Sequence, residues 1–336
     1  MNKQRSVKHS NIAIFVPHIG CKHMCSFCNQ RHITGQSAAP HADDVDSAVL
    51  TALASPHYDK ACGQIAFFGG SFTAVERGYM LELLGAAKRH IDIGNAASVR
   101  ISTRPDCIDD EILSLLSEYG VKSIELGAQS MCDDVLALNE RGHTSADVEK
   151  AARLIKSYGF ELGLQMMTGL YGDSDDKSVK TAEKIIALQP RTVRIYPTVV
   201  LENTRLCELY RAGKYLPQTV DEAAALGARL IPMFLENDIE IIRFGLHTIN
   251  EDKLAAGPWH PALAELAYSK IYMNILKNEF TGKPQGSYII NVNPSEISKT
   301  AGQKKCNLEM LRKMGYNCKI RSADMPKYCV RITREE

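Results

Sequence analysis

The sequence lacks a long apolar run: none of its segments approaches the roughly 18 consecutive apolar residues that a membrane-spanning helix needs. It also lacks a charge excess, because 40 basic residues face 39 acidic ones and leave a net charge of +1. We therefore expect no membrane partner and no attraction to nucleic acid over the whole surface. Any binding site for a polyanion must be local.

The sequence also lacks the features of a secreted protein, namely a dense disulfide framework and a signal peptide. Ten cysteines lie at irregular intervals in 336 residues, whereas small secreted domains carry dense disulfide frameworks. The apolar stretch at residues 12–16 is too short for a signal peptide and ends before Pro17. We therefore expect a reducing, cytoplasmic setting. The length and the 45% hydrophobic content suit one large domain with a smaller one.

Short apolar runs bounded by turn residues recur along the chain and predict β-strands. Segments with helical spacing lie between them, one behind a predicted Asp109 cap and one between a Thr144–Asp147 capping signature and Gly159. Another contains Pro232, which is expected to kink or end its helix. Strands that alternate with helices pair in parallel through right-handed crossovers. The expected strands are 11–16, 64–70, 98–105, 123–130, 160–170, 192–200 and 240–247.

The predicted fold is α/β: a partial (β/α)6–7 TIM-like barrel of parallel strands with a small C-terminal α/β extension. We place the barrel domain at residues 1–250 and the extension at residues 251–336. Within the extension, helices are expected at 260–278 and 302–316. Strands are expected at 287–293, 318–322 and 327–332.

Unusual residues follow each of the first six predicted strands. In parallel α/β barrels the ligand site forms at the C-terminal ends of the strands. Glycine and proline also end strands without any function, but polar or sulfur-bearing groups at every end favour a site. These strand-end residues are Cys21, Cys25 and Cys28; Gly69, Gly70 and Ser71; Thr103, Arg104 and Pro105; Gln129 and Ser130; Gln165 and Met166; and Tyr196 and Pro197.

The three cysteines after the first strand are separated by three and then two residues. A structural zinc site normally has four protein ligands, and nearby histidines offer a fourth: His18, His23 and His32. A cubane iron–sulfur cluster held by three thiolates instead leaves one iron open to a substrate or cofactor. We favour the cluster. A zinc-stabilised binding protein without turnover is the alternative.

The motif resembles the CxxxCxφC signature of the radical S-adenosylmethionine (SAM) superfamily, in which an aromatic residue precedes the last cysteine. Cys21, Cys25, Phe27 and Cys28 match it. The resemblance implies an enzyme with a [4Fe-4S] cluster whose open iron binds SAM. One electron, from a donor of the flavodoxin or ferredoxin type, then splits the sulfonium to give a deoxyadenosyl radical. Phe27 is then expected to lie against the adenine.

Further positions resemble SAM-binding positions of this superfamily. Gly69-Gly70-Ser71 stands where the superfamily has a GGE ending that meets the SAM amino group, with Ser71 in place of Glu. The spacing of Gln129 and Arg141 is that of members in which these side chains contact the ribose and the carboxylate. A surface arginine after a helix is the alternative for Arg141. Strand-end position adds other candidates, which are Thr103, Arg104, Ser130, Gln165 and Met166 for the cofactor and Tyr196 for catalysis.

A closer resemblance, over roughly residues 10–250, is to the radical SAM domain of the Elongator catalytic subunit. Three motifs carry it: STRPD (102–106), QSMCDDVLALNERGHT (129–144) and RIYPTVVLENTRL (194–206). It implies transfer RNA modification at the wobble uridine. The chain departs from that family in its tighter cysteine spacing, in Ser102 where Glu is common, and in having no acetyl-CoA-binding glycine signature after His247. The alternative substrate is a small molecule such as a porphyrin precursor.

The C-terminal extension is basic from about residue 281, where 11 basic residues face 5 acidic ones. Such a local excess can bind phosphate backbones, although charge runs are as often solvated faces. The candidate RNA-binding residues are Lys304, Lys305, Arg312 and Lys313. A second metal cluster at Cys306, Cys318 and Cys329 is a further, less favoured hypothesis because strand cysteines usually serve packing.

Overall fold

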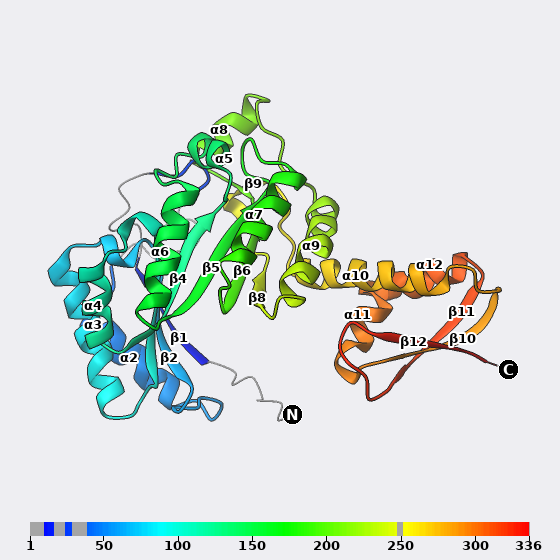
Figure 1. Ribbon diagram of the computed structural model, residues 1–336, viewed down its shortest axis with the longest axis horizontal. Helices are drawn as coiled ribbons and strands as arrows, with labels where there is room; N and C mark the ends of the chain where they lie inside the picture. Colours follow the sequence, from blue (N-terminus) through cyan, green and yellow to red (C-terminus); the bar gives the residue numbers. More distant parts are fainter. Residues whose placement is uncertain (1–9, 17–23, 29–38, 247–250, 336) are drawn as a thin grey trace.

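Seven parallel strands curl into a half-barrel, which confirms the predicted fold class (Figure 1). The computed structural model describes residues 10–16, 24–28, 39–246 and 251–335. Within the sheet the strands follow one another in chain order. Their bounds are β1 (Ser10–Val16), β2 (Gly63–Gly69), β3 (Ser98–Thr103), β4 (Val121–Gln129), β5 (Glu161–Thr168), β6 (Thr192–Pro197) and β8 (Glu240–Phe244).

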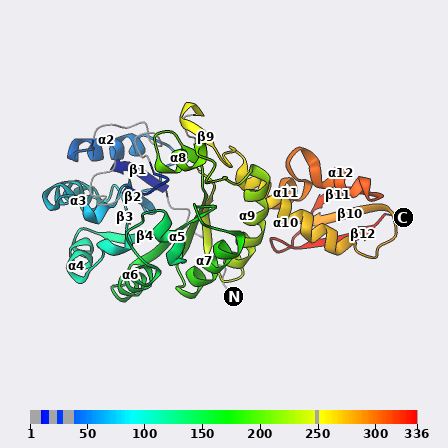
Figure 2. The same ribbon diagram turned by 90° about the horizontal axis from the view of Figure 1, so that it is seen from above.

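Helices cover the outer face of the curved sheet, as Figure 2 shows for α3, α4, α6 and α7. The strands present apolar side chains to them at alternate positions; Phe67, Ile101 and Ile124 are neighbours in register across β2, β3 and β4. The helices up to β8 are α2 (Ala42–Leu53), α3 (Arg77–Asp92), α4 (Asp110–Glu118), α5 (Asp133–Leu138), α6 (Ser145–Ser157), α7 (Asp175–Ala187), α8 (Arg205–Arg211) and α9 (Val220–Leu235).

Local sequence signals set several helix ends as predicted. The Asp109 side chain accepts a hydrogen bond from Ile112 N and so begins α4. Thr144 and Asp147 form a capping box at the start of α6. Pro232 lies inside α9, which continues to Leu235, so it does not end that helix.

The strand predicted at 192–200 is two strands. β6 ends at Pro197, which has no N–H to donate, and Thr198 N turns back to donate to Thr168 O at 2.9 Å. The chain then forms β7 (Val200–Leu201), which pairs antiparallel with β9 (Leu254–Ala256). A segment after residue 250 therefore still pairs with one before it.

The C-terminal part forms a three-stranded sheet in the order β11-β10-β12. Apolar residues of α10, including Leu276 and Phe280, pack on this sheet, and α10 also contacts α9 of the half-barrel. Since α10 belongs to both cores, the domain boundary at 250/251 stays a prediction. The elements are α10 (Leu263–Phe280), β10 (Gly286–Val292), α11 (Ile297–Ala301), α12 (Cys306–Lys313), β11 (Tyr316–Ser322) and β12 (Val330–Arg334).

The helix predicted at 302–316 is shorter in the structure. Lys304 and Lys305 have φ values of 53° and 62°, in the left-handed region, so α12 starts only at Cys306. Over the part of the chain that the structure describes, no helix is long and apolar enough to cross a membrane.

Candidate functional site

Two thiols of the cysteine motif lie on one turn, since Cys28 N donates to Cys25 O at 3.1 Å. Cys21 is outside the described residues. Ser26, between the thiols, is buried and donates from its hydroxyl to Asn139 Oδ1 at 2.7 Å. Leu206 N donates to Ser26 O at 2.8 Å. The turn is thus fastened to the end of α5 and the start of α8.

Ser26 and Asn139 were missed in the sequence. Asn139 is fully buried and also donates to Val135 O at 2.8 Å and Tyr171 O at 2.9 Å. The available signal was a polar residue at the end of a short apolar helix, a position that commonly bonds backbone groups. Asn139 therefore joins the cysteine turn, the end of α5 and the segment after β5.

Arg141 reaches the cysteine turn. Its Nη1 donates to Cys25 Sγ at 3.1 Å and its Nη2 to Gly127 O at 2.7 Å, and only 6% of the residue is exposed. Its Nε is buried and has no hydrogen-bond partner among the described residues. A buried guanidinium with a spare donor beside a thiol suits an anionic ligand. This placement disfavours the surface-arginine alternative.

Gln129 lies beside Arg141 because β4 ends in a bulge. The register of β4 shifts between Gly127 and Gln129, and Gln129 has a φ of 64°. A Cβ on Gly127 would lie 2.8 Å from Gln129 Nε2 and 3.4 Å from Arg141 Nη2, so glycine leaves room for both. Gln129 Oε1 is buried without a partner among the described residues.

His143 supports this bulge from behind. Its Nε2 lies 3.3 Å from Ala128 O, to which the neutral ring donates. Burial, and then the charge of Arg141, lower the pKa of His143 from 6.5 to about 4. The ring is therefore neutral near pH 7 and holds the backbone that aims Gln129. The sequence motif RGHT contained this residue, but its role depends on tertiary packing.

The glycines at the end of β2 adjoin the end of β1. Gly69 has a φ of 112°, and a Cβ there would lie 2.6 Å from Val16 O; Gly70 N donates to the same oxygen at 2.8 Å. Only glycine fits this approach. Ser71 Oγ lies 2.9 Å from Thr103 Oγ1, which ties β2 to β3.

Arg104 holds Arg141 in place. Its Nε donates to Asp106 Oδ1 at 2.9 Å, and its Nη2 donates to Arg141 O. The charge of Arg104 is therefore already paired with Asp106. Ser130 points away from the site, since its hydroxyl lies 3.3 Å from Thr181 Oγ1 of α7 and accepts from Cys132 N. The structure gives both residues contacts that position the chain.

The inner face of the half-barrel carries a buried ionic network that was not predicted from the sequence. Glu125 of β4 is fully buried and pairs with Arg100 at 3.1 Å and Arg194 at 2.8 Å. Burial alone raises the pKa of Glu125, but Arg194 and Arg100 outweigh it and lower that pKa. Gln165 donates to the same carboxylate. The overlooked signal was the two-residue alternation of polar and apolar positions in these strands.

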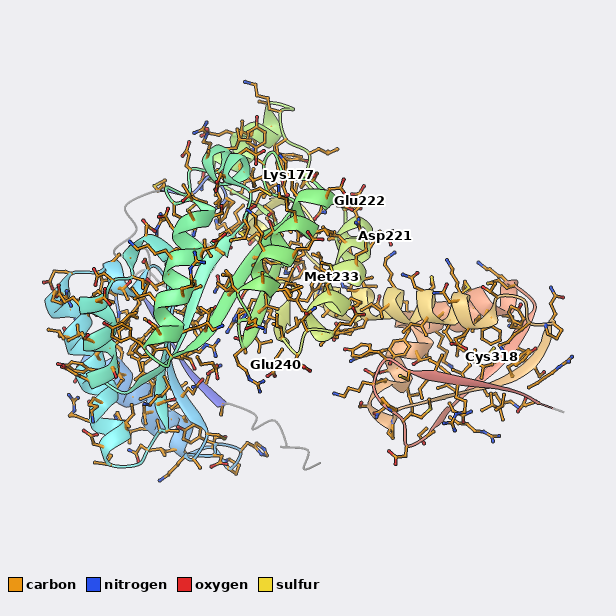
Figure 3. All side chains as sticks on the ribbon, in the orientation of Figure 1. Lys177, Asp221, Glu222, Met233, Glu240 and Cys318 are labelled. Atoms are coloured by element: carbon orange, nitrogen blue, oxygen red, sulfur yellow. The ribbon has the colours of Figure 1, made fainter. Side chains whose placement is uncertain are left out.

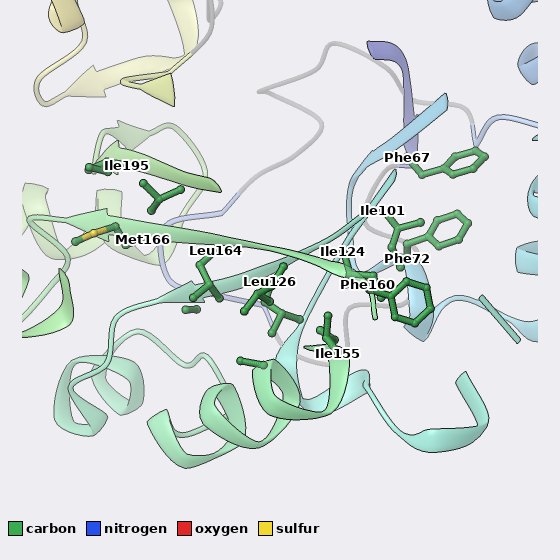
Figure 4. Close-up of a cluster of buried hydrophobic side chains, with 14 of the residues drawn as sticks. Phe67, Phe72, Ile101, Ile124, Leu126, Ile155, Phe160, Leu164, Met166 and Ile195 are labelled. Atoms are coloured by element: carbon green, nitrogen blue, oxygen red, sulfur yellow. The ribbon is translucent and has the colours of Figure 1, made fainter. Parts of the chain in front are cut away.

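Two predicted cofactor residues pack among apolar side chains. Met166 is fully buried in the core behind the sheet, near Leu164 and Ile195 (Figure 4). Phe27 is half-buried and packs against clusters that include Leu170 and Tyr171. The side chain of Met166 therefore does not share the inner face with its neighbour Gln165.

The four candidate RNA-binding residues are all exposed. Lys304 and Lys305 precede α12, whereas Arg312 and Lys313 occupy its last turn, roughly 12 Å away at 1.5 Å per helical residue. The hypothesis of a second metal cluster gains no support, because no group of three potential ligands forms among the described residues. Cys318 lies on the C-terminal sheet (Figure 3), and burial raises its pKa to about 11.

The site fits the two expected cofactors. Cys25 and Cys28 share a turn, and a buried arginine contacts one of the sulfurs. Gln129 Oε1 and Arg141 Nε have no partner in the described part of the chain, so they favour a polar ligand. SAM carries groups that match both atoms: its carboxylate can accept a hydrogen bond from Arg141 Nε, and a ribose hydroxyl can donate one to Gln129 Oε1.

Comparison with known proteins identifies family models along most of the chain. The model described as radical SAM superfamily matches residues 15–185, and that of the Radical_SAM C-terminal domain matches residues 190–274. The tRNA uridine(34) acetyltransferase of Methanocaldococcus infernus is 33% identical over 126 residues, which cover 37% of this chain and 24% of that protein. Human Elongator complex protein 3 is 30% identical over 138 residues, 40% of this chain and 25% of that protein.

Among solved structures, the N-terminally truncated archaeal Elp3 of Methanocaldococcus infernus superposes with a TM-score of 0.65. The match covers 80% of this chain and 63% of that one at 22% identity, so it supports the fold. Since the aligned regions span about a quarter of the curated relatives named above, the activity of the whole relatives does not transfer directly.

Proposed function

The chain belongs to the radical SAM superfamily and is an enzyme, and we propose that it uses a [4Fe-4S] cluster on Cys21, Cys25 and Cys28 to cleave SAM and modify transfer RNA. The contact of Arg141 Nη1 with Cys25 Sγ at 3.1 Å carries this proposal. It joins two motifs that are 116 positions apart, and it puts a carboxylate-binding group next to the cluster ligands.

The residues of the chain have distinct roles in this proposal. Arg141 binds the SAM carboxylate through its spare Nε, and Gln129 accepts a hydrogen bond from the ribose through Oε1. Gly69 and Gly70 let the backbone approach the amino group, and Phe27 faces the adenine. The bound cluster would supply the electron that breaks the sulfonium bond, delivered by a donor of the flavodoxin or ferredoxin type. Tyr196 is the candidate for a contact with the substrate.

Two observations support transfer RNA as the substrate. Relatives named for tRNA uridine(34) and for Elongator align with 37% and 40% of this chain, and exposed basic residues lie at both ends of α12. Because these relatives are named for transfer RNA and Elongator, we also propose a cytoplasmic location. The small-molecule alternative predicts no change in transfer RNA.

The proposal is tested in two steps. Protein purified without oxygen should be brown and contain about four irons and four sulfides per chain; bound zinc without sulfide would instead favour the zinc-stabilised binding protein. Nucleosides of transfer RNA from cells with and without the gene are then compared by mass. A missing or truncated modification at a uridine supports the substrate, whereas identical profiles remove transfer RNA from the account.

A further inference from the structure

We propose that Arg243, together with Arg194 and Tyr196, binds an oxyanion of the substrate on the inner face of the half-barrel. This inference rests on the proposed function because it gives that radical site a substrate carrying a phosphate or carboxylate group. It is independent of the groups assigned to SAM, which lie at the ends of β2 and β4.

The strand register puts two arginines side by side. Arg194 of β6 and Arg243 of β8 are Cα partners, and paired strands lie about 4.8 Å apart. Gln165 of β5 is the partner of Arg194 on its other side, so this row belongs to the inner face. Like charges directly opposite each other destabilise a sheet, unless an anion lies between them.

The charges of the inner face do not balance. Arg100 pairs with Glu125 at 3.1 Å and lies 3.8 Å from Glu161, and Arg194 pairs with Glu125 at 2.8 Å. The side chain of Arg243 forms no ion pair or hydrogen bond with any residue that the structure describes. Among the described residues, the three arginines Arg100, Arg194 and Arg243 therefore lie near two carboxylates, and Arg243 is the one without a negative partner.

The surroundings of Arg243 favour an anion. Burial, and the neighbouring Arg194, lower the pKa of Arg243, although Tyr196 opposes this effect. A partly desolvated guanidinium without a carboxylate gains more from an added anion than a solvated one does. The positive end of this row is thus the part of the inner face best suited to bind one.

Tyr196 adds a neutral donor. Its hydroxyl oxygen accepts from Arg194 Nη1 at 3.4 Å, and no acceptor for its own proton occurs among the described residues. Burial raises its pKa, so it keeps that proton. Two forked guanidiniums and one hydroxyl suit a phosphate or a carboxylate. A nucleotide phosphate and the carboxylate of a small substrate share this chemistry.

Thermal unfolding of the anaerobically reconstituted full chain tests the site. Uridine 5′-monophosphate, malonate and uridine are titrated separately, with sodium chloride keeping the ionic strength constant. The unfolding temperature of the wild type should rise with the logarithm of the concentration of one of the two anions once this exceeds Kd, and should rise less with uridine. A shift with the monophosphate indicates a nucleotide phosphate, and a shift with malonate indicates a carboxylate substrate.

Variants of Arg243 test whether this residue forms the anion-binding site. Arg243→Met should weaken the apparent affinity for the effective anion about tenfold or more, and its unfolding temperature without anion should equal or exceed that of the wild type. Arg243→Lys keeps the positive charge but loses the two-pronged hydrogen bonding of the guanidinium, so it should bind the anion with intermediate affinity. This variant replaces Arg243→Met in the test if the Met variant does not fold. The matched control is Arg191→Met, an exposed arginine just before the same strand β6.

Three results would overturn the proposal: no shift with either anion, equal shifts in wild type and Arg243→Met, or a larger loss of affinity for SAM than for the anion. Deoxyadenosine formation by the wild type is measured separately. If the wild type binds the anion but forms no deoxyadenosine, only the proposed function is contradicted. If it forms deoxyadenosine but binds no anion, only this inference is contradicted.

Discussion

Arg141 is the residue at which the separate motifs of this protein meet. It contacts Cys25 in the cysteine turn and Gly127 in β4, and its backbone oxygen accepts from Arg104 beyond β3. The resemblance of their spacing to that of SAM-binding positions in the superfamily suggested that Gln129 and Arg141 act together. The bulge that brings them together was not predictable, because a φ of 64° at a glutamine depends on its tertiary surroundings.

Arg141→Ala should weaken SAM binding by roughly 1.5–3 kcal/mol, or about tenfold or more, because a charge-assisted bond to the carboxylate is lost. Binding of SAM to the reconstituted enzyme is measured by equilibrium dialysis. Arg153→Ala, an exposed arginine on α6, is the control. An Arg141→Ala enzyme with wild-type affinity would exclude the carboxylate contact.

His143 makes the stability depend on pH. Its pKa is about 4 in the folded protein and 6.5 ordinarily, so the unfolded chain binds more protons between these values. Its contribution to stability is complete above pH 6.5 and declines as the pH falls toward 4, by up to roughly 3 kcal/mol.

Urea unfolding at several pH values compares the wild type with His143→Asn, whose amide can still donate to Ala128 O but does not titrate. The variant should lose less stability than the wild type between pH 6.5 and 4. Parallel curves for the two proteins would show that His143 is not buried in neutral form.

At the scale of elements, the alternation of apolar runs and helical segments was enough to predict all seven strands of the half-barrel. Their outward residues, such as Phe67 and Ile101, carry the signal because one face must be buried. The ionic inner face was missed because Arg100, Glu125 and Arg194 come from three strands, and only the folded sheet joins them. The β7–β9 pair was missed because its strands are two and three residues long.

Gly69→Ala should lower the free energy of unfolding by about 3 kcal/mol, since it combines an unfavourable φ with a clash against Val16 O at the joint of β1 and β2. Gly94→Ala is the matched control, because Gly94 also has a positive φ, of 74°, but open space around it. It should cost about 1 kcal/mol. Chemical denaturation measures both, and equal losses would show that the approach to Val16 is not tight.

At the scale of the whole molecule, α10 joins the half-barrel to a small C-terminal sheet (Figure 1). Exposed basic residues, among them Lys304, Lys305, Arg312 and Lys313, give this C-terminal part a basic surface. The composition of the last 56 residues predicted this surface, but not that Lys304–Lys305 and Arg312–Lys313 lie at opposite ends of a short helix. Two separate basic pairs suit a polyanion that extends along the helix better than a single phosphate.

Reversing these four residues to Glu should weaken transfer RNA binding and flatten its dependence on salt, because fewer counterions are released. Filter binding across salt concentrations measures both effects. The control reverses four exposed bases of the half-barrel: Lys122, Lys150, Arg153 and Lys180. If the two variants bind equally well, the C-terminal bases are only a solvated surface.

In the proposed function, Cys21, Cys25 and Cys28 hold the cluster that cleaves SAM. The most direct measurement is the deoxyadenosine formed from SAM after reduction with dithionite, for the reconstituted wild type and the triple Cys→Ala variant side by side. We expect deoxyadenosine from the wild type and none above background from the variant, which should also bind no iron at this site. Deoxyadenosine from the triple variant would contradict the proposed function.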